Sequence, residues 1–100
     1  MTNQPVTIEH VREQIDSLDQ RIVDLIAERQ RWVIAAGALK KDADAVRAPQ
    51  RVEQVIAKVR RLADAAQASP EVVERTYREM VAAFIELELE HHHEHAPEGQ

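Results

Sequence analysis

Cysteine is absent from this chain of 100 residues, which excludes disulfide bonds, a thiol nucleophile and a cysteine-based zinc site. Glycine occurs only twice and proline only four times. So few chain breakers disfavour a β-sandwich, which needs turn signals at short intervals, and they exclude the glycine-rich loops that cradle phosphates. Aromatic residues are also scarce, and the sequence has only Trp32, Tyr77 and Phe84.

Positive charge is limited as well, because 13 basic residues face 18 acidic ones and give a formal net charge of -5. This balance argues against nucleic acid as a partner. No apolar run approaches the roughly 20 residues of a membrane span, so we expect no membrane partner. No basic segment followed by an apolar stretch opens the chain, and we therefore expect a cytoplasmic protein. Apolar residues at 44% and charged residues at 31% are typical of one soluble globular domain.

The first long pattern predicts one helix over residues 7–41, capped by Thr7. Its apolar residues recur at spacings of four and three and form a heptad seam of Val11, Ile15, Leu18, Ile22 and Leu25. Such a helix is a rod of roughly 50 Å, whereas a globule of this length is only about 30 Å across. The rest of the chain is too short to cover that rod. We therefore expect an intertwined homodimer in which two copies share their long helices.

Two further helices follow, so the expected fold is all-α with three helices per chain. Small and polar residues at 41–48 predict a connector, and Pro49 fits the first turn of a helix that runs to about Ala66. Ser69, Pro70 and Glu71 then have the order of an N-cap, a first helical residue and a first-turn acid. We expect an N-terminal tail at 1–6, a helical domain at 7–90 and a histidine-rich, frayed tail at 91–100.

Charged residues interrupt the apolar seams and are the candidates for chemistry. One heptad beyond Ile22 the first seam reaches Arg29, and a charge there is costly unless an anion meets it. Lys40 follows eleven residues later, near the same face. Arg12 flanks the seam about 25 Å from Arg29, so it can reach the same ligand only from the second chain of an antiparallel dimer. The alternatives are an Arg29 that snorkels or pairs with a glutamate, a Lys40 that satisfies the helix dipole, and a solvated Arg12.

The other candidates lie on the second and third predicted helices. Glu88 ends an apolar stripe of Tyr77, Val81 and Phe84, and its alternative is a surface glutamate of an acidic helix end. Arg47 and Arg51 lie one turn apart at a helix entrance, where they bind an anion or are simply solvated. Arginine binds carboxylates bidentately, so this basic set suits a small dianion inside a helical bundle. No nucleophile and base pair is evident, which favours a chemistry that needs neither a nucleophile nor a cofactor.

These residues resemble the all-α chorismate mutases in order and in spacing. Residues 11–19 (VREQIDSLD) resemble that family's opening motif, residues 26–29 (IAER) its L-x-x-R segment, and residues 37–40 (GALK) its G-x-x-K segment. The intervals of 17 and 11 residues from Arg12 to Arg29 to Lys40 match the family. An aromatic residue eleven positions before Glu88 matches the family's third helix. The resemblance covers roughly residues 8–90.

The resemblance implies an intertwined dimer with two sites that rearrange chorismate to prephenate in the shikimate pathway, without metal or other cofactor. Arg29 and Arg12 of the partner subunit would bind the substrate carboxylates, Lys40 a carboxylate and the ether oxygen, and Arg51 the anionic end. Glu88 would face the ether oxygen, which requires its protonated form because a carboxylate would repel the developing negative charge. Four more residues complete the expected substrate-binding set: Arg47, Val52, Val81 and Phe84.

The start of the second predicted helix departs from the mutase pattern. Family mutases commonly carry an Asp and then a Glu that contacts the substrate hydroxyl, where this chain has Ala48 and Val52. Residues 47–52 (RAPQRV) instead resemble the isochorismate-pyruvate lyases, which share the fold. A lyase that forms salicylate and pyruvate is therefore an alternative, as is a mutase of 4-amino-4-deoxychorismate or a non-catalytic helical dimer. Clustered histidines of the tail, His91, His92, His93 and His95, can bind a metal, but no closed ligand set is evident and we expect none.

Overall fold

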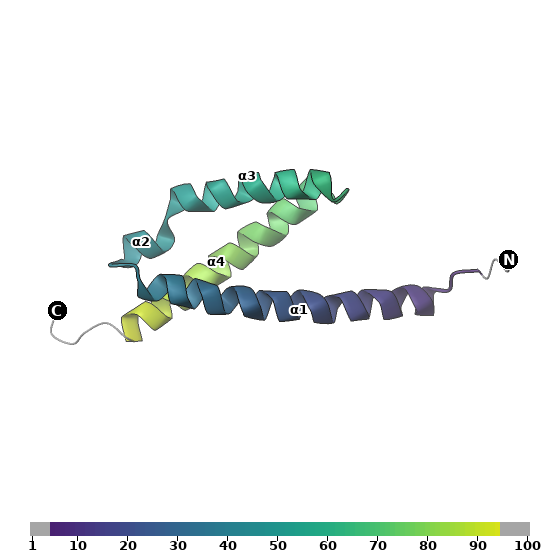
Figure 1. The fold of residues 1–100 in the computed structure, drawn as a ribbon, viewed down its shortest axis with the longest axis horizontal. Helices are drawn as coiled ribbons and strands as arrows, with labels where there is room; N and C mark the ends of the chain where they lie inside the picture. Colours follow the sequence, from purple (N-terminus) through teal and green to yellow (C-terminus); the bar gives the residue numbers. More distant parts are fainter. Residues whose placement is uncertain (1–4, 95–100) are drawn as a thin grey trace. The chain divides into compact units, whose positions relative to one another are not determined.

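The computed structural model of the chain describes residues 5–94, and these are almost entirely helical. Helix α1 spans Ile8–Ala38, α2 Ala43–Arg47, α3 Pro49–Ala65 and α4 Pro70–Glu94 (Figure 1). The all-α fold and the long N-terminal helix are confirmed, and a short fourth helix joins the three expected ones. None of the helices in this part of the chain combines the length and the apolar character needed to cross a membrane.

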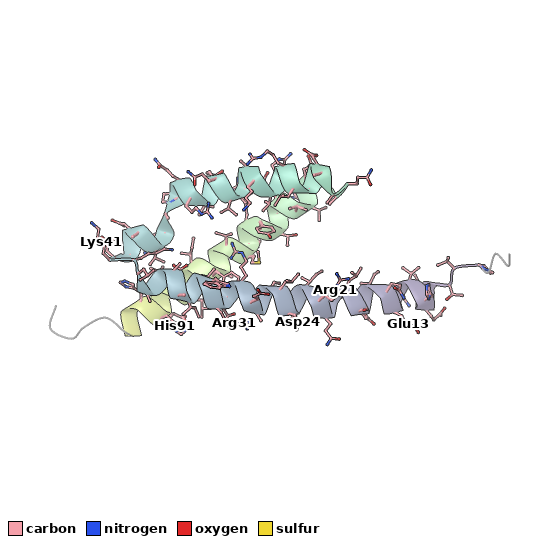
Figure 2. All side chains as sticks on the ribbon, viewed as in Figure 1. Glu13, Arg21, Asp24, Arg31, Lys41 and His91 are labelled. Carbon is pink, nitrogen blue, oxygen red and sulfur yellow. The ribbon has the colours of Figure 1, made fainter. Side chains whose placement is uncertain are left out.

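The chain is divided into two compact units, and the boundary between them falls within α1, after Trp32. The first unit consists of the N-terminal part of α1, which begins where expected because the backbone N–H of His10 donates to Thr7 Oγ1 at 3.1 Å. Charged side chains such as Arg21 and Asp24 project from this helix (Figure 2). The apolar heptad seam is exposed, at between 38% and 64%, in all five of its residues: Val11, Ile15, Leu18, Ile22 and Leu25.

The second unit contains the end of α1 and the helices α2, α3 and α4, and it holds the core. Helix α4 packs against α3 along its N-terminal part and also against α2. Buried apolar side chains come from α2, α3 and α4: Val46, Ile56, Val59, Ala63 and Phe84. The core is small because the helices contribute only one narrow apolar face each.

Residues 41–48 are not simply a connector, as the sequence predicted, because α2 forms within them. The Asp42 side chain caps this helix and accepts a hydrogen bond from the backbone N–H of Ala45 at 2.8 Å. Val46 anchors it and is only 2% exposed. Ala48 then takes a left-handed conformation, with φ of 34°, between the end of α2 and the start of α3 at Pro49. Helix α1 accordingly ends at Ala38 rather than near Lys41.

Ion pairs fix α3 against α4 on the outside of their contact. Arg78 donates to both carboxylate oxygens of Glu53, at 2.9 and 3.0 Å, and to Glu74 at 2.7 Å. Arg60 also donates to Glu74, at 2.8 Å. Hydrogen bonds from Arg78 lower the pKa of Glu53, and those from Arg78 and Arg60 lower the pKa of Glu74. Because these groups are exposed to solvent, the network sets the pairing of the helices more than it stabilises them.

Helix α4 begins as predicted and ends later than predicted. The backbone N–H of Val72 donates to Ser69 Oγ at 3.3 Å, so Ser69 is the N-cap. At its other end α4 continues to Glu94, four residues into the segment that the sequence assigned to a frayed tail. The extension has a tertiary cause, since His92 is hydrogen-bonded to the backbone at Lys40. His95 lies outside the described residues.

Candidate active site

Lys40 and Glu88 form the centre of the candidate site, although 48 residues separate them in the sequence. Lys40 Nζ lies 3.0 Å from Glu88 Oε2 and 3.4 Å from Glu88 Oε1. Lys40 follows the last turn of α1, where its backbone N–H donates to the carbonyl of Gly37 at 3.1 Å. Glu88 lies on α4. The two residues that the family resemblance places at the ether oxygen are thus in direct contact.

Burial of Glu88 is what sets this pair apart from the other ion pairs of the unit. Its side chain is 7% exposed, whereas that of Lys40 is 28% exposed. The alternative of a surface glutamate is therefore wrong. A buried carboxylate is costly unless it is paired and hydrogen-bonded, and the Lys40 ammonium group supplies both interactions. Because Lys40 remains partly exposed, its ammonium group is still reachable by a ligand from solvent.

Gly37 makes room for Glu88 against the end of α1. A Cβ atom on Gly37 would lie 3.3 Å from Glu88 Cγ and 3.4 Å from Cδ and Oε2. Carbon atoms pack best at about 3.5–4.0 Å, so a side chain here would crowd the carboxylate. Gly37 is also the only residue of α1 that is buried. The sequence identified it only as part of a motif, and the close approach of α4 supplies the physical reason.

Arg47, the last residue of α2, and Arg51, in the first turn of α3, lie on the surface of the second unit. Arg47 Nη1 is 3.8 Å from Asp44 Oδ1, an exposed pair within α2 and at the limit of a salt bridge. Arg51 is exposed and Val52 is half-buried. The assignment of Arg47, Arg51 and Val52 to a ligand remains a prediction.

The apolar stripe on α4 leads to Glu88 as the spacing predicted. Phe84, one turn before Glu88, is 8% exposed and belongs to the core. Val81 is half-buried, and so is Tyr77. Phe84 therefore serves first to pack the helix that carries Glu88, and contact with a substrate stays a prediction for both Val81 and Phe84.

Arg12 and Arg29 belong to the first unit and lie on α1. Arg12 is exposed, and Arg29 is only partly exposed. With a rise of 1.5 Å per residue, about 25 Å of helix separates them. This distance supports the expectation that one ligand cannot contact both arginines of the same chain.

Within the part of the chain that the structure describes, no three His, Cys, Asp or Glu side chains gather closely enough to hold a metal ion. The groups that do gather are an ammonium and a carboxyl group. The ammonium group can place a positive charge next to a substrate oxygen, which is the basis of electrostatic catalysis. Sequence reasoning missed one member of this cluster, His92, whose ring lies 2.9 Å from the Lys40 carbonyl.

Comparison with known families identifies the family of the chain. The sequence model of chorismate mutase type II matches residues 11–89, which include Arg12, Arg29, Lys40 and Glu88. No curated protein aligns significantly with the chain. The match covers most of the 100 residues, from the first turn of α1 to within α4. The chain therefore belongs to the chorismate mutase type II family.

Proposed function

We propose that this protein catalyses the rearrangement of chorismate to prephenate. The observation that carries the proposal is the contact of Lys40 with the buried Glu88, in a chain whose family is shown. The reaction breaks the ether C–O bond as the enolpyruvyl arm forms a new C–C bond to the ring. It requires no nucleophile and no redox group, which agrees with a site built from an ammonium and a carboxyl group.

Lys40 has the geometry for the central electrostatic role. Its ammonium group has three donors, and contacts to the two oxygens of Glu88 leave donor capacity for a substrate oxygen. Negative charge develops on the ether oxygen as the C–O bond breaks, and a fixed positive charge stabilises it. The protonated form of Glu88 would add a second donor to the same oxygen. Burial keeps the Glu88 side chain in place without solvent around it.

Arg29 would bind one substrate carboxylate and so hold the enolpyruvyl arm over the ring, a proximity effect. Arg12 of the partner subunit would bind the other carboxylate. The dimer is proposed because the seam of α1 exposes five apolar side chains at heptad spacing, a pattern typical of helices that pair with another helix. We propose that a second copy of the chain covers this seam, because the α1 helix of that copy carries the same apolar seam over the same length.

Two arginine variants can test both the dimer and the proposal that each site contains residues of both subunits. Arg29→Ala is expected to lower kcat/KM at least about a hundredfold, because a bidentate charged partner is lost, and Arg12→Ala should act similarly. When the two variants are unfolded and refolded together, each mixed dimer contains one intact site and one doubly impaired site. About a quarter of wild-type activity should return for random assortment into symmetric dimers. No recovery, or a monomeric mass by sedimentation with helix content intact, would exclude the shared site.

A second candidate is an isochorismate-pyruvate lyase, which Ala48 and Val52 favour because neither residue can hydrogen-bond a substrate hydroxyl through its side chain. Both reactions would use the same residues to bind the substrate carboxylates. Purified protein should be incubated separately with chorismate, isochorismate and 4-amino-4-deoxychorismate while prephenate, salicylate and pyruvate are followed. Lys40→Ala is the control. Equal formation of product by wild type and Lys40→Ala, or no product from any substrate, would support a non-catalytic dimer instead.

A further inference from the structure

His92 is hydrogen-bonded to the backbone of the residue that carries the central charge of the site. Its Nε2 atom lies 2.9 Å from the Lys40 carbonyl oxygen. A carbonyl oxygen only accepts hydrogen bonds, so the ring must donate through Nε2–H. His92 lies four residues after Glu88 on α4, and residues four apart share one face of a helix. One face of α4 therefore contacts Lys40 twice.

The two contacts hold Lys40 at opposite ends. Glu88 contacts the ammonium group at the tip of the side chain, and His92 contacts the carbonyl at its base. Lys40 needs this second contact because it lies after the end of α1 and before the cap of α2 at Asp42. A carbonyl between two helices lies outside both helical hydrogen-bond ladders, and a hydrogen-bond donor from elsewhere in the fold satisfies it. His92 supplies a donor for the carbonyl of the residue that matters most to the site.

We propose that His92 is a positioning residue, which fixes the backbone of Lys40 so that its ammonium group meets both Glu88 and the substrate oxygen. This inference rests on the proposed function, since it concerns the same site. The proposal gives His92, which belongs to the histidine-rich segment, a role that involves no metal ion. His92 touches no reacting atom and acts only through Lys40.

Three variants test the role. His92→Leu keeps a comparable volume and removes the donor, His92→Gln keeps an N–H donor, and Glu90→Gln is a control at an exposed position of the same helix. We expect His92→Leu to lower kcat about tenfold with little change in KM, since one net hydrogen bond corresponds to roughly that factor. His92→Gln should recover most of the loss, and Glu90→Gln should match wild type. A His92→Leu protein that is folded and fully active would overturn the proposal, and so would failure of His92→Gln to recover activity.

A double-mutant comparison separates this inference from the proposed function. If His92 acts through Lys40, adding His92→Leu to Lys40→Ala should lower the residual activity no further. Multiplying effects would mean that His92 acts elsewhere. If Lys40→Ala itself keeps full activity, the proposed function fails instead.

The hydrogen bond also has a readout that requires no catalysis. Nitrogen NMR of the histidine rings, with His92 assigned by its loss in His92→Gln, should show the Nε2–H tautomer at about pH 8, where histidine is ordinarily neutral. The Nδ1–H tautomer would contradict the contact, whatever the substrate proves to be. Circular dichroism of each variant shows whether the helices are retained, so that a loss of folding is not mistaken for a loss of positioning.

Discussion

Replacing Gly37 by alanine is expected to lower activity, while two opposing effects keep the change in folding stability small. Two effects on the free energy of unfolding oppose each other. Alanine favours a helix over glycine by about 0.5–1 kcal/mol, and by less near a helix end, where Gly37 lies. Against this, the new methyl group would meet Glu88 Cγ at 3.3 Å. Overpacking costs about 1–3 kcal/mol, and the flexible glutamate side chain places this case at the lower end.

The net change in the free energy of unfolding should therefore stay within about 1 kcal/mol, which corresponds to a few degrees in Tm. Activity should fall because a shift of Glu88 Cγ also moves the carboxylate oxygens that meet Lys40. Glu88 Oε2 would lie 3.4 Å from the new Cβ and already lies 3.0 Å from Lys40 Nζ. A misplacement of about 1 Å can cost a factor of 100 in rate, so a shift of a few tenths of an ångström should cost about fourfold in kcat/KM.

The assay compares Tm and kcat/KM for Gly37→Ala, Gly37→Val and a control, Ala36→Gly. Ala36 is exposed on the same turn, so the control changes helix propensity in the opposite direction without a group that reaches Glu88. We expect a graded loss of activity from Ala to Val and a less stable but fully active control. Wild-type kcat/KM for Gly37→Ala would refute the idea that Gly37 makes room for Glu88.

Two further predictions concern other parts of the second unit. Val52→Glu should lower KM for chorismate by restoring a side chain that can hydrogen-bond the substrate hydroxyl; an unchanged KM would show that the start of α3 does not face the hydroxyl. Gln67→Gly should raise the free energy of unfolding by up to about 1 kcal/mol, because Gln67 has φ of 61° after α3 and glycine accepts that conformation without strain. Thermal unfolding measures the second effect, and Ala66→Gly, at φ of -90°, is a control that should destabilise the protein instead.

Much of the fold was predictable because local signals agree with the tertiary structure. Thr7 and Ser69 cap α1 and α4 as their residue types indicate, and Pro49 begins α3. Helix α2 was not predictable from periodicity, since five residues make little more than one turn. Its stability comes from burial of Val46, which only the packed structure reveals. The extension of α4 to Glu94 likewise depends on a contact across the fold, between His92 and the Lys40 carbonyl.

The sequence pointed to Lys40 and Glu88 as candidates, but it did not predict their contact or the contact of His92 with the Lys40 carbonyl. Glu88 was identified because it ends an apolar stripe, where a charge is costly, and Lys40 because its spacing from Arg29 matches the family. Their direct contact spans 48 residues of sequence, so no local pattern contains it. The role of Gly37 was hidden for the same reason, because a glycine near a helix end is equally typical of a simple helix stop.

The protonation of Glu88 decides whether it acts as a donor to the substrate or only as a support for Lys40. As a donor it must carry its proton, so activity should fall as pH rises and the acid ionises. Glu88→Gln should remove that fall, since an amide donates at every pH. The pH dependence of kcat, which reports the complex with substrate, should be measured for both proteins between about pH 4 and 9.

Unfolding in acid also lowers activity, but it does so at the low end of this pH range. It can therefore be distinguished from a loss of activity at higher pH. The folded-state pKa values of Glu53 and Glu74 are lowered by their arginine partners. Their contribution to stability is therefore present above the ordinary pKa of a carboxyl group and is lost as pH falls. A loss of helix content at low pH should be common to wild type and Glu88→Gln, whereas the loss of activity at higher pH should occur only in wild type. Identical profiles for the two proteins would show that Glu88 holds Lys40 in place and donates no hydrogen bond to the ether oxygen.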